Sequence, residues 1–435
     1  MHAYRLSHRS FAVSALLLAG ACTGKHGDVA RSDSAADSAA DSGFTPPCSG
    51  GAWGDIDPAV VATALHVSAG AAAGGDGSEA LPFQSIDDAV TASRADGATK
   101  VIVIWPGSYP SSLDLGSLHG DDGLQLEGCS AGEVSLTGSD ASLPILKISG
   151  GSGLGVRGLT LAGGHRGLWV WEGASVTVDD VHAASNAVLG VVIDGAGTQA
   201  TMTNLVISDP SASSGFGGYG LAVRNAVVSA TNVTVSGATE EGILVDGDTA
   251  SISLSTVAVT NTAARGSDGE YGRGITIQNL ASASITDGTF TGNHDAGIFG
   301  LGAALLDILR AQVDGTLPSS LPASEDTSGD GIVASDRPEG EPYATTYFSS
   351  SIQDVSVSGS SRAGVLLSGD GLGVSLAGTN PIAASTSDPS AGSAADGGGL
   401  PLVQAGARVS GGDVFAMSTP LAIQSVAAAL DGLSP

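Results

Sequence analysis

The sequence predicts an all-β fold, a single-stranded right-handed parallel β-helix (a solenoid) with three short strands per coil of about 22 residues plus loop insertions. Three observations predict it. A glycine followed by aliphatic residues recurs through the middle of the chain, the chain holds 65 glycines, and aromatic residues make up only 4%. Short strands and tight turns favour small, β-branched and glycine residues more than helices do.

The recurring glycine marks the start of each repeat. With its aliphatic successor it stands at Gly167-Leu168, Gly190-Val191, Gly220-Leu221, Gly242-Ile243, Gly274-Ile275, Gly297-Ile298, Gly331-Ile332 and Gly364-Val365. The spacing is 22 or 23 residues where nothing is inserted and 30 to 34 residues elsewhere. The additional residues fall in segments rich in Gly, Ser, Asp and Pro, at 208–219, 262–273 and 316–330, which we expect to be inserted loops.

Each repeat contains three strands separated by turns. In the repeat that begins at Gly242, we expect strands at 243–245, 251–254 and 257–259. Asp246-Gly247 ends the first strand, as expected where the backbone needs positive φ, and Ser255-Thr256 marks a bend before the third. Stacked coils would pair each strand in parallel with its copies above and below, and the inward aliphatic side chains would form one continuous core.

Two other architectures fit the pattern less well. A doubly wound α/β fold needs a helix after each strand, and no amphipathic ten-residue pattern lies between the strands. An antiparallel β-sandwich would not place three strands and the same turn residues in fixed phase in every repeat.

The N-terminus is typical of an exported bacterial lipoprotein. In residues 1–21, a basic segment precedes an apolar stretch at 11–21, which is shorter than the roughly 20 residues needed to span a bilayer. Residues 18–22, Leu-Ala-Gly-Ala-Cys, are similar to the lipobox, where the cysteine is lipidated before cleavage. We therefore predict a signal peptide at 1–21, a lipid anchor on Cys22 and a location at the outer membrane or cell surface. Ordinary secretion is the alternative.

The remaining chain divides by composition. Residues 22–47 repeat Asp, Ser and Ala with almost no large apolar side chains, which predicts a disordered tether. Residues 48–150 are expected to form an N-terminal cap and the first coils, residues 151–375 the regular coils with inserted loops, and residues 376–435 degenerate coils or a cap. Cys48 and Cys129 are an isolated pair in an exported chain, which predicts a disulfide.

The N-terminal part of the body contains a recognisable series of motifs. Gly-Asp-Gly-Ser stands at 75–78, Pro-Phe at 82–83, an aliphatic strand at 101–104 and Trp-Pro-Gly-Ser-Tyr at 105–109. Asparagine also precedes the repeat glycine by four residues at 186–190 and 293–297. These features resemble the pectin lyase-like right-handed parallel β-helix proteins over residues 60–375. The resemblance implies the fold but no single activity, because this fold hosts lyases, hydrolases, epimerases and adhesins.

The signatures of the best-known enzymes of this family are absent. Asn261-Thr262 is followed by Ala263 where the polygalacturonase motif has aspartate, and no Arg-Ile-Lys occurs. Pectate lyases need a basic residue and a calcium cluster, and the only lysines are at 25, 100 and 147. We therefore expect no catalysis; the alternative is a diverged polysaccharide lyase or glycoside hydrolase.

Polar residues stand one to three positions before the repeat glycine, where polygalacturonases of this fold carry their catalytic pair. These residues, the ladder, are Arg166, Glu240, Glu241, Arg273, His294, Asp295, Asp330 and Arg362. On stacked coils they would line one edge of the solenoid at about 4.8 Å spacing. Glu240, Glu241, His294 and Asp295 are candidates for acid/base chemistry, and Arg166, Arg273 and Arg362 for binding an acidic sugar. The alternative is ordinary polarity of exposed turns.

Two further patterns are compatible with a metal site or a sugar-binding surface. Asp326 and Asp330 stand in a segment that resembles the first half of a calcium loop, although Arg337 replaces the expected acid at position twelve. Calcium is therefore an option, and an acidic loop is the alternative. Trp169 and Trp171 share a strand face, which we expect to be the core, whereas an outward pair would offer a surface for sugar stacking.

The charge restricts the partners. A formal net charge of −28, from 16 Lys plus Arg against 44 Asp plus Glu, argues against nucleic acid and anionic lipid, which bind cationic surfaces. We expect a monomer that needs no cofactor and contacts the membrane only through its anchor. The function we expect is binding or display toward a polysaccharide or cell-surface glycan, with an adhesive or structural spacer as a further alternative.

The lipid anchor generates a direct prediction. Substitution Cys22→Ala should block maturation, because the acyl chains and the cleavage both depend on the thiol, and the wild type should partition with the membrane fraction. Fractionation followed by immunoblotting measures both. Equal recovery of the two proteins in a soluble fraction would contradict a lipid anchor on Cys22.

Overall fold

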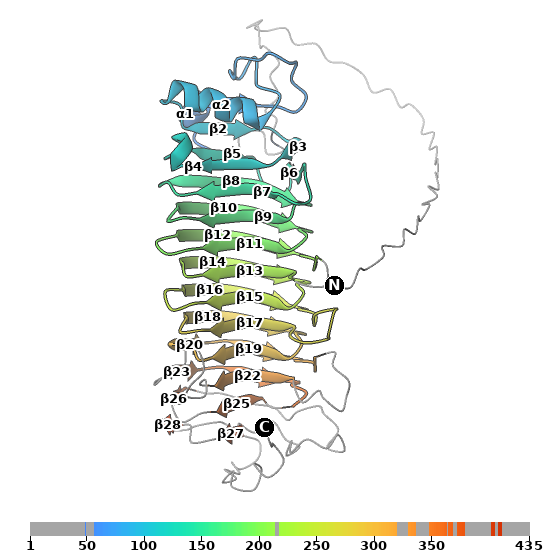
Figure 1. Cartoon of the computed structure of the whole chain (residues 1–435), viewed down its shortest axis with the longest axis vertical. Coiled ribbons are helices and arrows are strands. Elements are labelled where there is room, and N and C mark those ends of the chain that lie inside the picture. Colours follow the sequence, from blue (N-terminus) through green and yellow to red (C-terminus); the bar gives the residue numbers. More distant parts are fainter. Residues whose placement is uncertain are drawn as a thin grey trace, which may run out of the picture. The chain divides into compact units, whose positions relative to one another are not determined.

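The structure is a computed structural model that describes residue 48 and residues 56–213, 217–319, 329–335, 348–362, 364–368, 372–378, 402–404 and 408–410. The predicted signal peptide, Cys22, the tether, Asp326 and most of 376–435 lie outside these residues. The described residues form a parallel β-helix, in which the strands stack in order of sequence (Figure 1). All strand pairs are parallel, which confirms the predicted fold.

Two short helices and a strand begin the body. They are α1 (Pro58–Val61), β1 (Leu65–Val67) and α2 (Ile86–Asp96). Helix α2 starts where the Ser85 side chain accepts a hydrogen bond from the Asp88 amide at 3.1 Å, and it ends at Gly97 with φ 70°. Its buried face, Ile86, Ala89 and Val90, packs onto the first coil beside β2 (Figure 1). The helix therefore covers the edge of the solenoid that would otherwise expose unpaired strands.

The first coils precede the regular ones. Their elements are β2 (Val101–Ile104), β3 (Gly107–Ser111), β4 (Leu113–Gly116), η1 (Ser117–His119), β5 (Gln125–Gly128), β6 (Val134–Gly138), β7 (Pro144–Ser149) and β8 (Leu154–Ala162).

The regular coils alternate a short and a long strand. The short strands form one sheet, here called the short-strand sheet: β9 (Arg166–Trp171), β11 (Leu189–Asp194), β13 (Tyr219–Arg224), β15 (Glu241–Asp246), β17 (Arg273–Gln278), β19 (Ala296–Leu301) and β22 (Asp330–Ser335), continued by β4 and β7 on one side. The long strands form the long-strand sheet: β10 (Ser175–Ala184), β12 (Gln199–Ser208), β14 (Val227–Ser236), β16 (Ser251–Thr260) and β18 (Ser282–Thr291), preceded by β8.

The last described coils have shorter strands. They are β20 (Leu305–Leu309), β21 (Gln312–Asp314), β23 (Phe348–Gln353), β24 (Ser356–Ser358), β25 (Val365–Ser368), β26 (Leu372–Ala377), β27 (Leu402–Gln404) and β28 (Arg408–Ser410). They continue the two sheets in the same parallel register.

The second and third predicted strands of a coil are in fact one bent strand. One residue with positive φ makes the bend in each long strand, at Asp180, Asn204, Asn232, Thr256 and Asp287. Four of these five residues are Asp or Asn, which tolerate this conformation better than most residues, and the fifth is Thr256. The strand pairing resumes directly after the bend. The first turn of the coil uses positive φ as predicted, for instance at Gly195 and Gly247.

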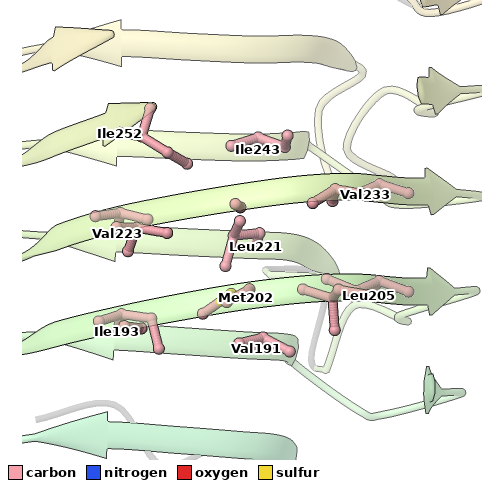
Figure 2. Packing of buried hydrophobic residues seen from close by; sticks show 14 of the residues in the cluster. Val191, Ile193, Met202, Leu205, Leu221, Val223, Val233, Ile243 and Ile252 are labelled. Carbon is pink, nitrogen blue, oxygen red and sulfur yellow. The ribbon is translucent and has the colours of Figure 1, made fainter. Parts of the chain in front are cut away.

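Aliphatic side chains fill the interior in columns. Val191, Leu221, Ile243 and Ile275 stand in register on successive short strands, and each is fully buried. Met202 and Leu205 of β12 face them from the long-strand sheet (Figure 2). Burying a side chain of this size stabilises the fold by about 1.5–3 kcal/mol, so the column of repeats is the main source of stability.

The repeat glycines allow adjacent coils to approach closely. A Cβ atom on Gly220 would lie 2.4 Å from the carbonyl oxygen of Gly242, one on Gly242 would lie 2.5 Å from that of Gly274, and one on Gly274 would lie 2.4 Å from that of Gly297. None of these glycines has positive φ. Close approach of the next coil, and not backbone conformation, therefore requires glycine at this place.

The two asparagines of the predicted motif play the same part in their coils. Asn186 and Asn293 are fully buried. The Asn186 amide donates to Leu161 O at 3.0 Å and accepts from Gly164 N at 3.1 Å, and Asn293 makes the equivalent contacts with Val259 O and Thr262 N. Each side chain thus links the end of a long strand to the turn that follows it, and its own buried amide is satisfied.

The predicted disulfide is present. Cys48 and Cys129 are bonded, with Cα atoms 5.7 Å apart and a sequence separation of 81. The bond links the start of the body to the turn after β5. Glu133 lies beside the two sulfurs, but bonded sulfurs are not thiolate ligands, so this group is not a metal site. In the described part of the chain no helix is long and apolar enough to cross a membrane.

Candidate functional site

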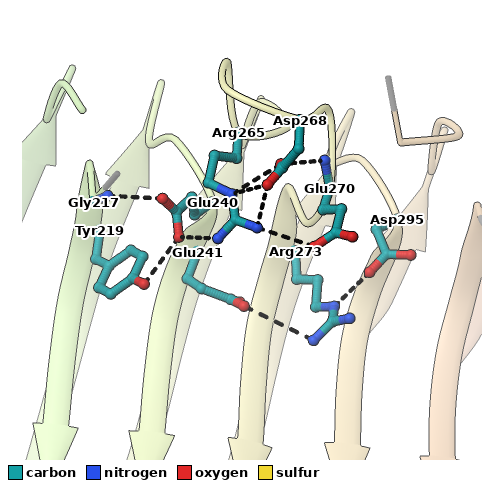
Figure 3. A network of polar contacts seen from close by, with 9 residues as sticks. All are labelled: Gly217, Tyr219, Glu240, Glu241, Arg265, Asp268, Glu270, Arg273 and Asp295. Atoms are coloured by element: carbon teal, nitrogen blue, oxygen red, sulfur yellow. Dashed lines mark hydrogen bonds and ion pairs between the residues drawn. The ribbon is translucent and has the colours of Figure 1, made fainter. Parts of the chain in front are cut away.

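The predicted ladder lies at one edge of the short-strand sheet. Arg166, Glu241, Arg273 and Asp330 are the first residues of β9, β15, β17 and β22. Glu241 and Arg273 are direct partners in the register of β15 and β17. The structure therefore brings Glu240, Glu241, Arg273 and Asp295 together, as Figure 3 shows.

Glu240 joins three segments of the chain. The residue is 2% exposed and its φ is 69°. One carboxylate oxygen accepts from the Gly217 amide at 2.7 Å, and the other accepts from the Tyr219 hydroxyl at 2.9 Å and lies 3.6 Å from the Arg265 guanidinium (Figure 3). These partners replace the water that a buried carboxylate loses. Glu240 therefore holds the two inserted loops, around Gly217 and Arg265, against β13 and β15.

Arg265 organises the loop between β16 and β17. Its Nε donates to both oxygens of Asp268 at 2.9 Å, and Nη2 donates to Glu270 at 3.0 Å. The guanidinium also lies 4.6 Å from the centre of the Tyr271 ring. The acceptors raise the pKa of Arg265 above its ordinary value, Asp268 most of all, so this side chain stays charged. Arg265 and Tyr271 had no signal in the sequence, because loop residues follow no period.

Arg273 lies between two acids, as the ladder predicts. Its Nη1 is 3.9 Å from Glu241, and its Nε donates to Asp295 (Figure 3). The guanidinium is stacked on Phe299, 3.7 Å from the ring centre. Thr276 on the same strand donates its hydroxyl to Glu241. The result is a compact chain of charges across three coils, in which each polar group has an internal partner.

Burial changes the acidity of Glu241. The residue is only 4% exposed, and desolvation raises the pKa of Glu241 to about 8, while Arg273 and the Thr276 hydroxyl act in the opposite direction. A carboxyl with this pKa is largely protonated at neutral pH. Burial also raises the pKa of Tyr219, which donates to Glu240. The site therefore holds a buried, largely protonated acid next to the partly exposed guanidinium of Arg273.

Glu240 and Glu241 are buried and do not project outward. The sequence indicates insertions at 208–219 and 262–273, but not that Gly217 and Arg265 within them contact Glu240. His294 is half-buried, and its Nδ1 lies 2.9 Å from Thr262 O. Asp295 and Arg273 are 17% and 16% exposed. In this part of the ladder, His294, Asp295 and Arg273 are the groups that a ligand could reach.

Arg362 and Asp330 meet in one ion pair. The guanidinium donates through Nε to Asp330 at 2.8 Å and through Nη2 to its other oxygen. Asp330 is 1% exposed. The residue predicted to bind calcium is thus bonded to the residue predicted to bind a sugar, and Asp326 lies outside the described residues.

Arg166 stands apart from the other arginines. Its guanidinium lies 4.8 Å from the ring centre of Trp169, and burial lowers the pKa of Arg166. Every other arginine whose side chain the structure describes has a carboxylate partner. In a chain with nearly three acids per base, a cation without an acid partner on the sheet surface is an exception.

The tryptophans face outward, contrary to the expectation that they are core residues. Trp169 and Trp171 are stacked, with ring centres 5.0 Å apart and planes at 29°. Leu168 and Val170 between them point inward and are fully buried. Both faces of this strand are apolar in sequence, so alternation alone did not indicate which one is core. The pair lies on the outer face of the short-strand sheet, and Lys147 stands over Trp171 at 5.3 Å.

The buried acid yields a prediction about pH. Because the folded pKa of Glu241 is about 8, above its ordinary 4.5, its bound proton stabilises the fold fully below pH 4.5, and this contribution is lost as the pH rises through 8. Glu241→Gln has no such proton. The Tm of the wild type should therefore fall relative to that of Glu241→Gln as the pH rises over this interval.

Thermal unfolding across that pH range measures the difference. Glu172→Gln, on an exposed turn, is the control and should follow the wild type. Parallel profiles for the wild type and Glu241→Gln would contradict the buried, protonated state.

Comparisons with known proteins concern the fold. The family described as "Right handed beta helix region" matches residues 148–308. No curated protein matches the chain. Similar solved structures include the catalytic domain of a GH87 alpha-1,3-glucanase in complex with tetrasaccharides (15% identity, 85% of this chain and 69% of that one, TM-score 0.49). Another is the A-module of the Azotobacter vinelandii mannuronan C-5 epimerase AlgE4 (17% identity, 77% of this chain and 95% of that one, TM-score 0.43). A third is the Dettilon tailspike protein (13% identity, 77% of this chain and 57% of that one, TM-score 0.45). The parallel strands and the matched family region show that the chain has a right-handed parallel β-helix fold.

Proposed function

We propose that this protein is a cell-surface lipoprotein that binds a polysaccharide on the outer face of its short-strand sheet, without acting on it chemically. The observation that carries the proposal is the stacked, outward-facing pair Trp169 and Trp171. Two neighbouring aromatic rings provide a broad apolar surface, and the C–H-bearing face of a sugar ring packs on such a surface.

Polar groups suited to hydroxyls surround the pair. Arg166 and Lys147 stand over the two rings, and the Trp169 Nε1 is a buried donor with no hydrogen-bond partner among the described residues. Binding sites for small polar ligands combine an apolar floor with a few placed donors in this way. An unpaired buried N–H costs free energy, so a ligand oxygen or a water at this place would stabilise it.

The ladder supports binding without catalysis. A general acid or base must come within hydrogen-bond reach of the bond it cleaves. The carboxyl groups of Glu240 and Glu241 are instead buried. They accept hydrogen bonds from Gly217, Tyr219 and Thr276, and they lie 3.6 Å from Arg265 and 3.9 Å from Arg273. In this proposal, they stabilise the loops that border the sheet face.

One observation favours the alternative, a glycoside hydrolase or polysaccharide lyase. Burial raises the pKa of Glu241 to about 8, the state that a general acid needs at neutral pH. A panel of acidic and neutral polysaccharides, incubated with and without calcium and assayed for new reducing ends and unsaturated products, tests it. If the wild type forms product from any substrate and Glu241→Gln does not, the protein is an enzyme and the non-catalytic proposal is wrong.

The predicted anchor and tether support a place at the cell surface. A lipid on Cys22 and a charged tether of residues 22–47 would hold the solenoid away from the membrane. The large negative net charge would keep it from adhering to anionic headgroups.

The tryptophan pair generates the test of binding. Trp169→Ala and Trp171→Ala should each weaken glycan binding about tenfold or more, because truncating a central aromatic contact removes most of its contribution. The melting temperature should change little, because both rings lie outside the core. A glycan array followed by titration calorimetry on the best ligand measures the effect.

Leu118→Ala is the matched control, since it removes an apolar side chain that is 87% exposed elsewhere on the surface. It should bind as the wild type does. A wild type that binds no glycan would favour the adhesive or structural spacer, and binding that survives both tryptophan changes would exclude this face as the site.

A further inference from the structure

The long-strand sheet carries a pocket of about 320 Å³ on its outer face, away from the tryptophan pair and the ladder. Its lining residues come from four successive coils and are Cys129, Ser130, Arg157, Gly158, Asp179, Asp180 and Asn204. The pocket lies at the bend of the long strands. Its volume is at the lower end of the range for small-ligand sites, roughly 300–1,000 Å³, and suits a ligand the size of a monosaccharide.

A single irregular turn creates the pocket. In the regular coils one residue makes the bend, whereas residues 129–133 separate β5 from β6 and stand out from the sheet. The Ala131 amide donates to Asp180 at 3.1 Å, and the Thr160 hydroxyl donates to Ala131 O. The disulfide between Cys48 and Cys129 fixes the base of this turn. The wall of the pocket is therefore held at three points.

The one cation of the pocket is already engaged. Arg157 stands in register between Glu127 and Asp179. Its Nε donates to Asp179 at 3.2 Å, and its Nη1 lies 3.8 Å from Glu127. The Asn204 amide also donates to Asp179, at 3.1 Å. The guanidinium is thus held by two carboxylates, and an anionic ligand would have to displace them.

The polar groups that remain are mainly acceptors. Asp180 uses one oxygen for the Ala131 amide, and neither its second oxygen nor the Ser130 hydroxyl has a partner among the described residues. The ionisable lining groups are two aspartates and one arginine, which leaves one net negative charge. Such a pocket attracts a ligand that is positively charged and rich in hydrogen-bond donors.

We infer that this pocket binds a small organic amine of monosaccharide size, with its ammonium group at Asp180 and an adjacent hydroxyl at Ser130. An amino sugar with a free amine has this chemistry. The inference stands independently of the proposed function, because it uses the other sheet and none of the residues of the ladder or the tryptophan pair.

A bare metal ion fits the pocket less well than an amine. A cation such as calcium needs several oxygen ligands around one point. Among the described residues, the only group of three potential metal-ligating side chains (His, Cys, Asp or Glu) close to one another is Cys48, Cys129 and Glu133. Asp179 and Asp180 form no such group with a third residue of these types. An ammonium needs only one carboxylate and neighbouring acceptors, which the pocket provides.

The test measures binding of D-glucosamine to the full chain by NMR titration at about 0.15 M salt, where attraction to distant charges is screened. D-Glucose, which lacks the amine, and D-glucuronate, which has the opposite charge, are titrated in parallel. Glucosamine should bind saturably, and the other two should bind about tenfold more weakly or worse, since a hydrogen bond to a charged group is lost.

Two variants locate the site. Asp180→Asn removes the charge and keeps the shape, and asparagine already occupies the same bend position at Asn204 and Asn232 with φ 53° and 56°. Ser130→Phe fills the pocket without changing its charge. Both should weaken glucosamine binding about tenfold or more. Asp287→Asn, at the equivalent bend outside the pocket, is the matched control and should bind as the wild type does.

Each other outcome overturns the inference. Equal binding by the wild type and both pocket variants would mean a general attraction to the acidic surface. Equal binding of glucose and glucosamine would exclude recognition of the ammonium group. If glucosamine showed no saturable binding, the pocket would not be a binding site for an amino sugar. Thermal unfolding shows whether each variant is folded. If Asp180→Asn is not folded, the binding of glucosamine to Ser130→Phe tests the pocket alone.

Discussion

The close approach of successive coils at the repeat glycines is the constraint on which the rest of the structure depends. At Gly242, a side chain would meet the carbonyl oxygen of Gly274 and the side chain of Val259. Because these positions have no side chain, the coils stack at the spacing of a parallel sheet, and the residues after each glycine fall into columns. The same contact places the residue before each glycine at one edge, which is how the ladder forms.

The ladder shows how a solenoid accommodates loops of different lengths. Glu240 bonds to Gly217 in one inserted loop and lies near Arg265 in the next, so the loops are fastened to the coil between them. Glu241 and Asp295 share Arg273 in the same manner one coil further on. Leaving a buried charge of this network, such as Glu240, unpaired would cost more than its ion pair contributes, so the network specifies the loop positions more than it adds stability. The outer face beside it, with the tryptophan pair, stays available for a ligand.

Much of the fold was predictable from the sequence, because each residue type that recurs in the repeat has one physical role. The glycines, the buried Asn186 and Asn293, and the positive-φ turns at Gly195 and Gly247 all lie where the pattern places them. The site was less predictable. Spacing located Glu241 and Arg273 side by side, but not the loop that buries them, and strand alternation did not indicate that Trp169 faces outward. The pocket at Asp180 depends on one irregular turn, which no period describes.

Hydrogen exchange of Gly242→Ala, compared with the wild type, tests the role of the glycine column most directly. The added methyl group should force β15 and β17 apart, lower the free energy of unfolding by about 1–3 kcal/mol and reduce amide protection on these two strands first. Gly266→Ala is the control, because nothing lies within 4 Å of its Cβ position and it should leave exchange unchanged. Unchanged protection of β15 and β17 in a stably folded Gly242→Ala protein would contradict the account.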